Sequence, residues 1–145
     1  MARAMGAHLG QPVLAWLLVY VCVIGTILVV DAIWLGMVAK KFYANQLGNL
    51  MRPDIKALPA LAFYLLFAAG LVILAVRPDD ASTSIREAAF LGGLVGFIAY
   101  GTYNMTNYAT LKDWPIKMTA VDWPFGTALS ALAAIVGRYV RVSIG

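Results

Sequence analysis

Four long stretches of apolar residues, separated by short clusters of charge, constrain what this chain can fold into. They cover about residues 12–39, 57–76, 88–111 and 115–140. Each has the ~20 residues that an α-helix needs to cross a hydrocarbon core of ~30 Å. Apolar residues make up 62% of the chain and charged residues 12%, whereas soluble domains have about 45–50% and about 25%. The sequence therefore predicts an all-α integral membrane four-helix bundle, a single transmembrane domain over residues 1–145.

The minor residue types exclude several kinds of site. The net charge of +4 comes from clusters that flank the apolar stretches, as at membrane boundaries, and not from a nucleic-acid-binding patch. Cys22 is the only cysteine and His8 the only histidine. A single cysteine forms no intramolecular disulfide, and a single histidine excludes most zinc and haem sites. We therefore expect no metal, no cofactor and no nucleic-acid partner.

The ends of the predicted helices carry recognisable signals. Pro12, Pro59 and Pro115 stand near expected helix starts, where a missing N–H costs little. Ser84, with Glu87 three residues later, resembles a capping box at the start of the third helix. These signals support the helix boundaries that the apolar stretches indicate.

The segment after the first helix, residues 40–51, has a helical pattern of its own. Tyr43, Leu47, Leu50 and Met51 follow an i, i+4, i+7, i+8 spacing, which forms one apolar stripe. This pattern predicts either a short helix on the membrane surface or a simple extension of the first helix. The spacing does not distinguish the two.

Four crossings would place both termini on the same side of the membrane. Tyr43, Trp114 and Trp123 have the amphipathic character of interfacial anchors. Lysine and arginine residues are divided almost evenly between the two sides, so the positive-inside rule leaves the orientation open.

Two carboxylates and two amides lie at similar depths inside the apolar stretches. Counting along the helices from the same membrane side, Asp31 and Asp122 lie at about 13 and 10 Å. Asn104 and Asn107 lie at about 12 and 8 Å from that side. Ionisable groups at membrane depth are costly and need a partner or a function. This convergence predicts a polar site in that half of the membrane.

Aromatic side chains accompany these polar groups. Tyr100, Asn104 and Asn107 share one face of the third helix, with Tyr103 at its edge, and Trp34 shares a face with Asp31. No arginine or lysine lies inside the helices near either aspartate, which disfavours their ionised form. The predicted polar cluster, a candidate ligand-binding site, comprises Asp31, Trp34, Tyr100, Tyr103, Asn104, Asn107 and Asp122.

The polar cluster has three interpretations. Its side chains could cross-link the helices by hydrogen bonds, form a site for a ligand, lipid headgroup or substrate, or mark a proton or cation path.

Gly92 and Gly96 form a GxxxG step on the third helix. We favour tight packing within the bundle over a dimer contact for this step.

Several segments, in order, resemble domain-of-unknown-function family 2177, small bacterial membrane proteins. They are Asp31-Ala32-Ile33-Trp34-Leu35-Gly36, Phe42-Tyr43 with Gln46-Leu47-Gly48, Phe63-Tyr64-Leu65-Leu66, Tyr100-Gly101-Thr102-Tyr103-Asn104-Met105-Thr106-Asn107 and Leu111-Lys112-Asp113-Trp114-Pro115. The resemblance implies a four-helix protein of the bacterial inner membrane, without assigned activity. Its relatives' association with fatty-acid-modifying enzymes suggests a connection with membrane lipids. Asn104 occupies a position where the family pattern has Asp.

Three classes of function remain open from the sequence. The small size and single polar cluster favour an accessory or ligand-binding component of a membrane assembly, whose partners are the bilayer and either other subunits or a lipid-like ligand. The alternative is an intramembrane enzyme for a lipid or isoprenoid, with Asp31 and Asp122 as acid and base. A further alternative is a small proton-coupled transporter, although no inverted repeat is evident. The sequence assigns no catalytic residue.

Overall fold

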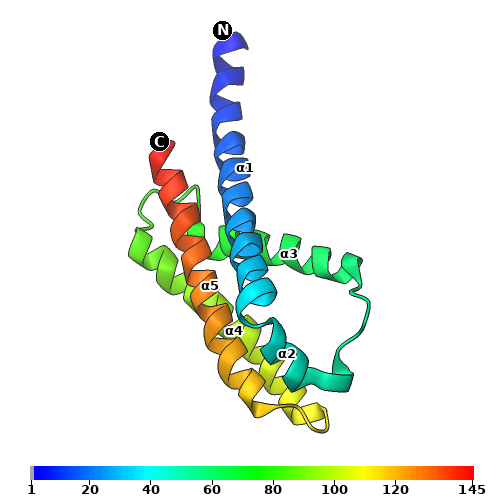
Figure 1. The fold of residues 1–145 in the computed structure, drawn as a ribbon. Coiled ribbons are helices and arrows are strands. Elements are labelled where there is room, and N and C mark those ends of the chain that lie inside the picture. Colours follow the sequence, from blue (N-terminus) through cyan, green and yellow to red (C-terminus); the bar gives the residue numbers. More distant parts are fainter. Residues whose placement is uncertain (1) are drawn as a thin grey trace.

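The computed structural model describes residues 2–145, with side chains from Val13 onward, and is helical throughout with short connections (Figure 1). Its described residues contain no β-strand. The α-helices are α1 (Ala2–Ile33), α2 (Lys40–Leu47), α3 (Ala57–Leu71), α4 (Ile85–Thr110) and α5 (Ile116–Ser143). Two π-helical turns, η1 (Trp34–Val38) and η3 (Val72–Val76), extend α1 and α3, and a 3₁₀ turn, η2 (Gly48–Leu50), follows α2. The all-α prediction is confirmed.

The long helices match the predicted apolar stretches closely. Helix α3 with η3 covers Ala57 to Val76, as predicted, and α4 and α5 differ from the predicted bounds by a few residues. The Ser84 hydroxyl accepts a hydrogen bond from the Glu87 N–H at 3.1 Å, so the predicted N-cap forms. Helix α1 begins at Ala2, so Pro12 does not mark its start. The side chain of His8 lies outside the described part of the chain.

Residues 40–47 form a separate short helix and do not extend α1. The π turn η1 ends in a hydrogen bond from the Ala39 N–H to the Trp34 carbonyl, at 2.7 Å, and α2 starts immediately afterwards. Tyr43 on α2 and Trp114 before α5 are buried together, with Met118 beside them. Tyr43 and Trp114, to which the sequence gives the character of interfacial anchors, are thus buried within the protein, where both side chains contribute to the packing of α2 against the start of α5.

Helices α4 and α5 run antiparallel, side by side, along most of their length (Figure 1). A methyl group added to Gly92 would lie 2.5 Å from the Ala134 Cβ and 2.7 Å from the Ser130 carbonyl oxygen. A methyl group on Gly96 would lie 2.7 Å from the Gly126 carbonyl oxygen. The GxxxG step thus brings the two backbones together within one chain, which is the packing role that the sequence analysis favoured.

The main apolar core joins α1, α3 with η3, and α5. Its fully buried side chains include Val23 and Ile27 of α1, Leu71 of α3 and Ala133 of α5. Gly137 on α5 permits this approach, because a Cβ there would lie 2.6 Å from a methyl carbon of Val23. Helix α3 runs across the bundle at a steep angle to α1, and its N-terminal half projects away from α5 (Figure 1).

The outward surface of the helices is strongly apolar. Three helical segments are long and apolar enough to cross a membrane, namely Val13–Val38, Ala57–Val76 and Ile116–Ser143. Large apolar side chains are exposed on them, such as Val21 at 60% and Leu66 at 73%. Such a surface is costly in water but suits contact with lipid chains. Helix α4, the remaining predicted crossing, is not among the three segments, and its C-terminal half carries several polar residues.

The connection between η3 and α4 is fixed by arginines near the end of α5. The Arg138 Nη2 donates to the Ala81 carbonyl oxygen at 3.2 Å, and the Arg141 Nε donates to the Pro78 carbonyl oxygen at 2.7 Å. Arg138 is only 4% exposed. These bonds satisfy backbone carbonyls beyond the end of η3 and attach this connection to α5.

The α4–α5 contact predicts opposite effects for two neighbouring glycines. Gly96→Ala should lower the free energy of unfolding by about 1–3 kcal/mol, because its methyl group would overlap the backbone of α5. Gly93→Ala should not, because its methyl group would meet only the Ala131 Cβ, at 3.7 Å, and should raise stability by about 0.5–1 kcal/mol through helix propensity. Unfolding of both variants in mixed micelles, followed by circular dichroism, tests this. Equal effects would contradict the close packing.

Candidate functional site

Asp122 on α5 is the meeting point of three helices. Its Oδ1 accepts a hydrogen bond from the Tyr43 hydroxyl of α2 at 2.7 Å. Its Oδ2 accepts one from the Asn104 amide of α4, also at 2.7 Å. The Asp122 side chain is buried, and both of its carboxylate oxygens are engaged. Because hydrocarbon offers no substitute donors, these bonds tie α2 and α4 to α5.

Trp34 extends this arrangement to the end of α1. Its indole Nε1 lies 3.4 Å from the Tyr43 hydroxyl, to which it donates a long hydrogen bond. Its ring stacks on Phe125 of α5, with centroids 4.3 Å apart and an interplanar angle of 10°. Trp34 is the first residue of the π turn η1. Such turns are frequent at functional sites because they alter the direction of nearby side chains.

Asp31 on α1 is held differently from Asp122. Its Oδ2 accepts a hydrogen bond from the Tyr64 hydroxyl of α3 at 2.9 Å. Its Oδ1 accepts no hydrogen bond from the side chains described, residues 13–145. The Asp31 residue is only 7% exposed. The structure thus contains one carboxylate with both oxygens engaged and a second with an oxygen left over.

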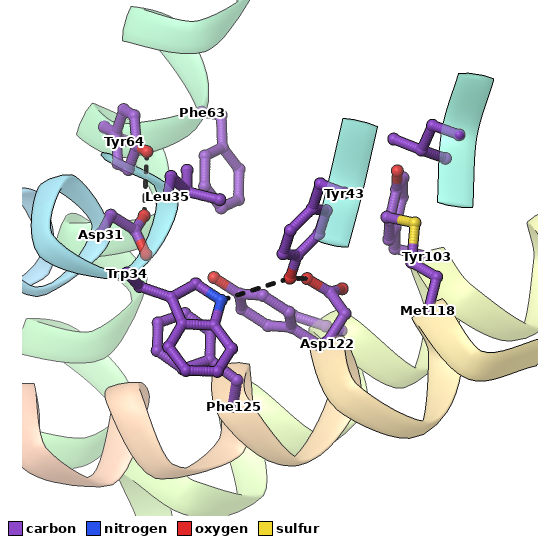
Figure 2. Close-up of a pocket in the computed structure, with 13 residues that line it drawn as sticks. Asp31, Trp34, Leu35, Tyr43, Phe63, Tyr64, Tyr103, Met118, Asp122 and Phe125 are labelled. Carbon is purple, nitrogen blue, oxygen red and sulfur yellow. Dashed lines mark hydrogen bonds between the residues drawn. The ribbon is translucent and has the colours of Figure 1, made fainter. Parts of the chain in front are cut away.

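The two aspartates line a shared cavity of about 520 Å³, which Figure 2 shows with its surrounding side chains. Helices α1 to α5 and the turn η1 all contribute residues. The lining is mainly aromatic and aliphatic and consists of Asp31, Trp34, Leu35, Tyr43, Leu47, Phe63, Tyr64, Ala99, Tyr100, Tyr103, Met118, Asp122 and Phe125. A mostly apolar cavity with a few convergent polar groups is the usual form of a small-molecule site.

Most of the predicted polar cluster lies at this cavity. Its wall includes the predicted residues Asp31, Trp34, Tyr100, Tyr103 and Asp122. Asn104 lies behind the wall, fully buried against Asp122. Asn107 is half-buried on α4 outside the lining, and its side chain makes no hydrogen bond to the described residues.

Two tyrosines of the site were not included in the predicted cluster. Tyr43 was considered only as an interfacial anchor, because it lies in the segment between two predicted crossings. Tyr64 was noted only as part of a segment that resembles the family. Between residues 57 and 76, however, it has the only side chain with a polar atom. A lone hydroxyl in an apolar helix was the signal that could have identified it as the partner of an intramembrane carboxylate.

The cavity is acidic in its composition. No residue in its lining is a lysine, arginine or histidine. Neither aspartate forms a salt bridge with any side chain described between residues 13 and 145.

Burial raises the pKa of the Tyr43 hydroxyl, which stays protonated and can donate to Asp122. No group of three or more metal-ligating side chains occurs among the described residues.

The helical fold, the apolar outer surface and the enclosed polar cluster define an all-α membrane protein. A family model described as "Predicted membrane protein (DUF2177)" matches residues 16–139. The chain belongs to this family, as its sequence motifs indicated. The matched region includes every residue of the cavity lining. No curated protein and no solved structure matches the chain.

The hydrogen bond between Tyr43 and Asp122 can be measured by a double-mutant cycle. Tyr43→Phe and Asp122→Ala should show a coupling of about 0.6 kcal/mol, and at most about 1.7 kcal/mol, in mixed-micelle unfolding. Tyr64→Phe serves as the control partner for Asp122→Ala, because Tyr64 donates to Asp31 instead. That pair should be additive within about 0.5 kcal/mol. Equal coupling in both pairs would contradict two separate carboxylate sites.

Proposed function

We propose that this protein binds a lipid-like ligand within the membrane and works as a ligand-binding or accessory component beside other membrane proteins. The observation that carries the proposal is the cavity of about 520 Å³ between the helices, with two carboxylates in a wall that is otherwise aromatic and aliphatic. Ligand sites commonly have volumes of about 300–1,000 Å³ and combine apolar walls with a few polar groups. A molecule with an apolar body and a small polar group matches this combination.

The arrangement of hydrogen bonds supports binding over a purely structural role. Asp122 accepts hydrogen bonds from both Tyr43 and Asn104, as expected of a group that cross-links helices. Asp31 accepts a hydrogen bond only from Tyr64, and its second oxygen accepts none from the described side chains. A polar atom left over at the wall of an apolar cavity is costly unless something enters to satisfy it. This asymmetry distinguishes Asp31 as a ligand contact from Asp122 as a support.

The cavity itself can be filled to test the proposal. Ala99→Phe places a large ring in the lining, whereas Ala109→Phe adds the same ring to an exposed position on the same helix. Native mass spectrometry of gently extracted protein should detect a retained small molecule in the unmodified chain and in Ala109→Phe. Ala99→Phe should lose most of it. Retention by Ala99→Phe, or the absence of any retained molecule from all three proteins, would contradict a ligand in this cavity.

We further propose that α4 crosses the membrane together with the three apolar segments, so that both termini face the same side of a bacterial inner membrane. Helix α4 packs along α5, and glycines place their backbones in close contact. Two helices packed in this way occupy the same depth. The polar residues of α4 that lower its hydropathy include Asn104, whose amide NH₂ group donates hydrogen bonds to the Tyr100 carbonyl and to Asp122 inside the protein. Its composition is therefore compatible with a crossing that is covered by neighbouring helices.

The proposed topology predicts which positions share a membrane side. In a Cys22→Ala background, single cysteines at Ser82 and Lys112 would flank α4 at its two ends. A membrane-impermeant maleimide should label one from each face of sealed, oriented vesicles. A cysteine at Ser143 should behave like the one at Ser82. Labelling of positions 82 and 112 from the same face would contradict the crossing of α4.

A further inference from the structure

We infer that the polar group of the ligand is an ammonium group, so that the cavity takes an amphiphilic amine in preference to an alcohol or a fatty acid. This inference rests on the proposed ligand-binding function and specifies the chemistry of its ligand. The structural reasons are the charge types in the lining, the unengaged oxygen of Asp31 and the aromatic surfaces that surround it.

The lining offers acceptors and two carboxyl groups without a balancing cation, so a cation from the ligand is what would favour their ionised form. Its titratable side chains are two aspartates and four tyrosines, with no lysine, arginine or histidine. Helices α1, α2, α3, α4 and α5 all face the cavity, so the balance covers every element packed around it. An anionic group such as a phosphate or fatty-acid carboxylate would meet repulsion and find no cationic partner there. A cationic group would supply the missing charge.

Asp31 is the carboxylate positioned to meet this charge. Its Oδ2 already accepts from Tyr64, while its Oδ1 accepts no hydrogen bond from the side chains described. Asp122 has its oxygens engaged by Tyr43 and Asn104. An ammonium N–H directed at the Asp31 Oδ1 would form a charge-assisted hydrogen bond, which is roughly twice as strong as a neutral one. The geometry therefore assigns the ammonium to the Asp31 end of the cavity.

Aromatic rings provide the rest of the ammonium environment. Figure 2 shows the Trp34 indole beside Asp31, stacked on Phe125, with the Tyr64 hydroxyl directed at the carboxylate. Tyr100 also lines this cavity. Ring faces attract cations, most strongly where water is excluded. A carboxylate among several rings is a common way of binding alkylated ammonium groups, and the same rings contact an apolar chain.

The apolar part of the ligand has room for about one chain. The cavity lies within the usual volume of a single small-molecule site. The amine could belong to a free long-chain amine or to the headgroup of an aminophospholipid, whose phosphate would then lie outside the cavity. Both sources share the ammonium chemistry, and they differ in whether the second chain and the phosphate remain in the bilayer.

The test compares three amphiphiles that have the same chain and different polar groups. Dodecylammonium, dodecanol and dodecanoate are titrated against the full-length protein in one detergent, and bound ligand is counted by native mass spectrometry. We expect dodecylammonium to bind about tenfold or more tightly than dodecanol, with dodecanoate weakest. Equal or tighter binding of dodecanol or dodecanoate would overturn the ammonium inference and leave the ligand site standing. Absence of binding by all three probes would overturn both.

Variants at Asp31 show whether the preference arises there. Asp31→Asn removes the charge and should reduce the preference for dodecylammonium to about threefold or less, whereas Asp31→Glu should keep it. Asp54→Asn, at an exposed position outside the cavity, is the control of matched charge and should behave as the unmodified protein. A preference that survives in Asp31→Asn would overturn the assignment to Asp31.

A final arm distinguishes the two sources of the amine. Protein is reconstituted in vesicles of phosphatidylethanolamine and phosphatidylglycerol with a trace of dodecylammonium, and then extracted for native mass spectrometry. Retention of phosphatidylethanolamine over phosphatidylglycerol would support a headgroup ligand. Retention of dodecylammonium alone would support a free amine. Preferential retention of phosphatidylglycerol would contradict an ammonium site.

Discussion

A carboxylate inside hydrocarbon must find its hydrogen-bond donors within the protein. The junction of α2, α4 and the first half of α5 is arranged around that constraint. Asp122 on α5 obtains one donor from Tyr43 on α2 and one from Asn104 on α4. These bonds place α2 against the start of α5 and fix the face of α4 that turns inward. The cavity lies beside this junction, so its wall depends on the same contacts. Loss of the carboxylate would leave two buried polar groups without partners.

The close approach of α4 and α5 makes this junction possible. Gly92 and Gly96 bring the backbone of α4 against Gly126 and Ser130 of α5. Only with this separation can the short Asn104 side chain reach Asp122. The remaining helices pack less closely around this pair, and α3 leaves the bundle at a steep angle (Figure 1). That divergence provides space for a cavity lined by η1 and by all five α-helices.

Much of this arrangement follows from the sequence because membrane helices obey strict length and polarity rules. The bounds of α3 with η3 could be derived by counting residues, and so could the convergence of Asp31, Asn104 and Asp122 on one region of the protein. The partners of the two aspartates could not. Tyr43 reaches Asp122 because the chain starts a separate helix, α2, directly after the π turn η1, a local change that periodicity does not reveal. Which carboxylate keeps a free oxygen likewise depends on side-chain geometry, not on spacing.

We propose that the cavity between Asp31 and Asp122 holds an amphiphile in the membrane, and a crystal structure from lipidic cubic phase, of protein extracted gently from its own membrane, would show the occupant itself. We expect elongated density in the cavity, with its polar end within hydrogen-bonding distance of the Asp31 Oδ1 and its chain among the aromatic side chains. A cavity closed by repacked side chains, or filled by ordered water alone, would contradict it.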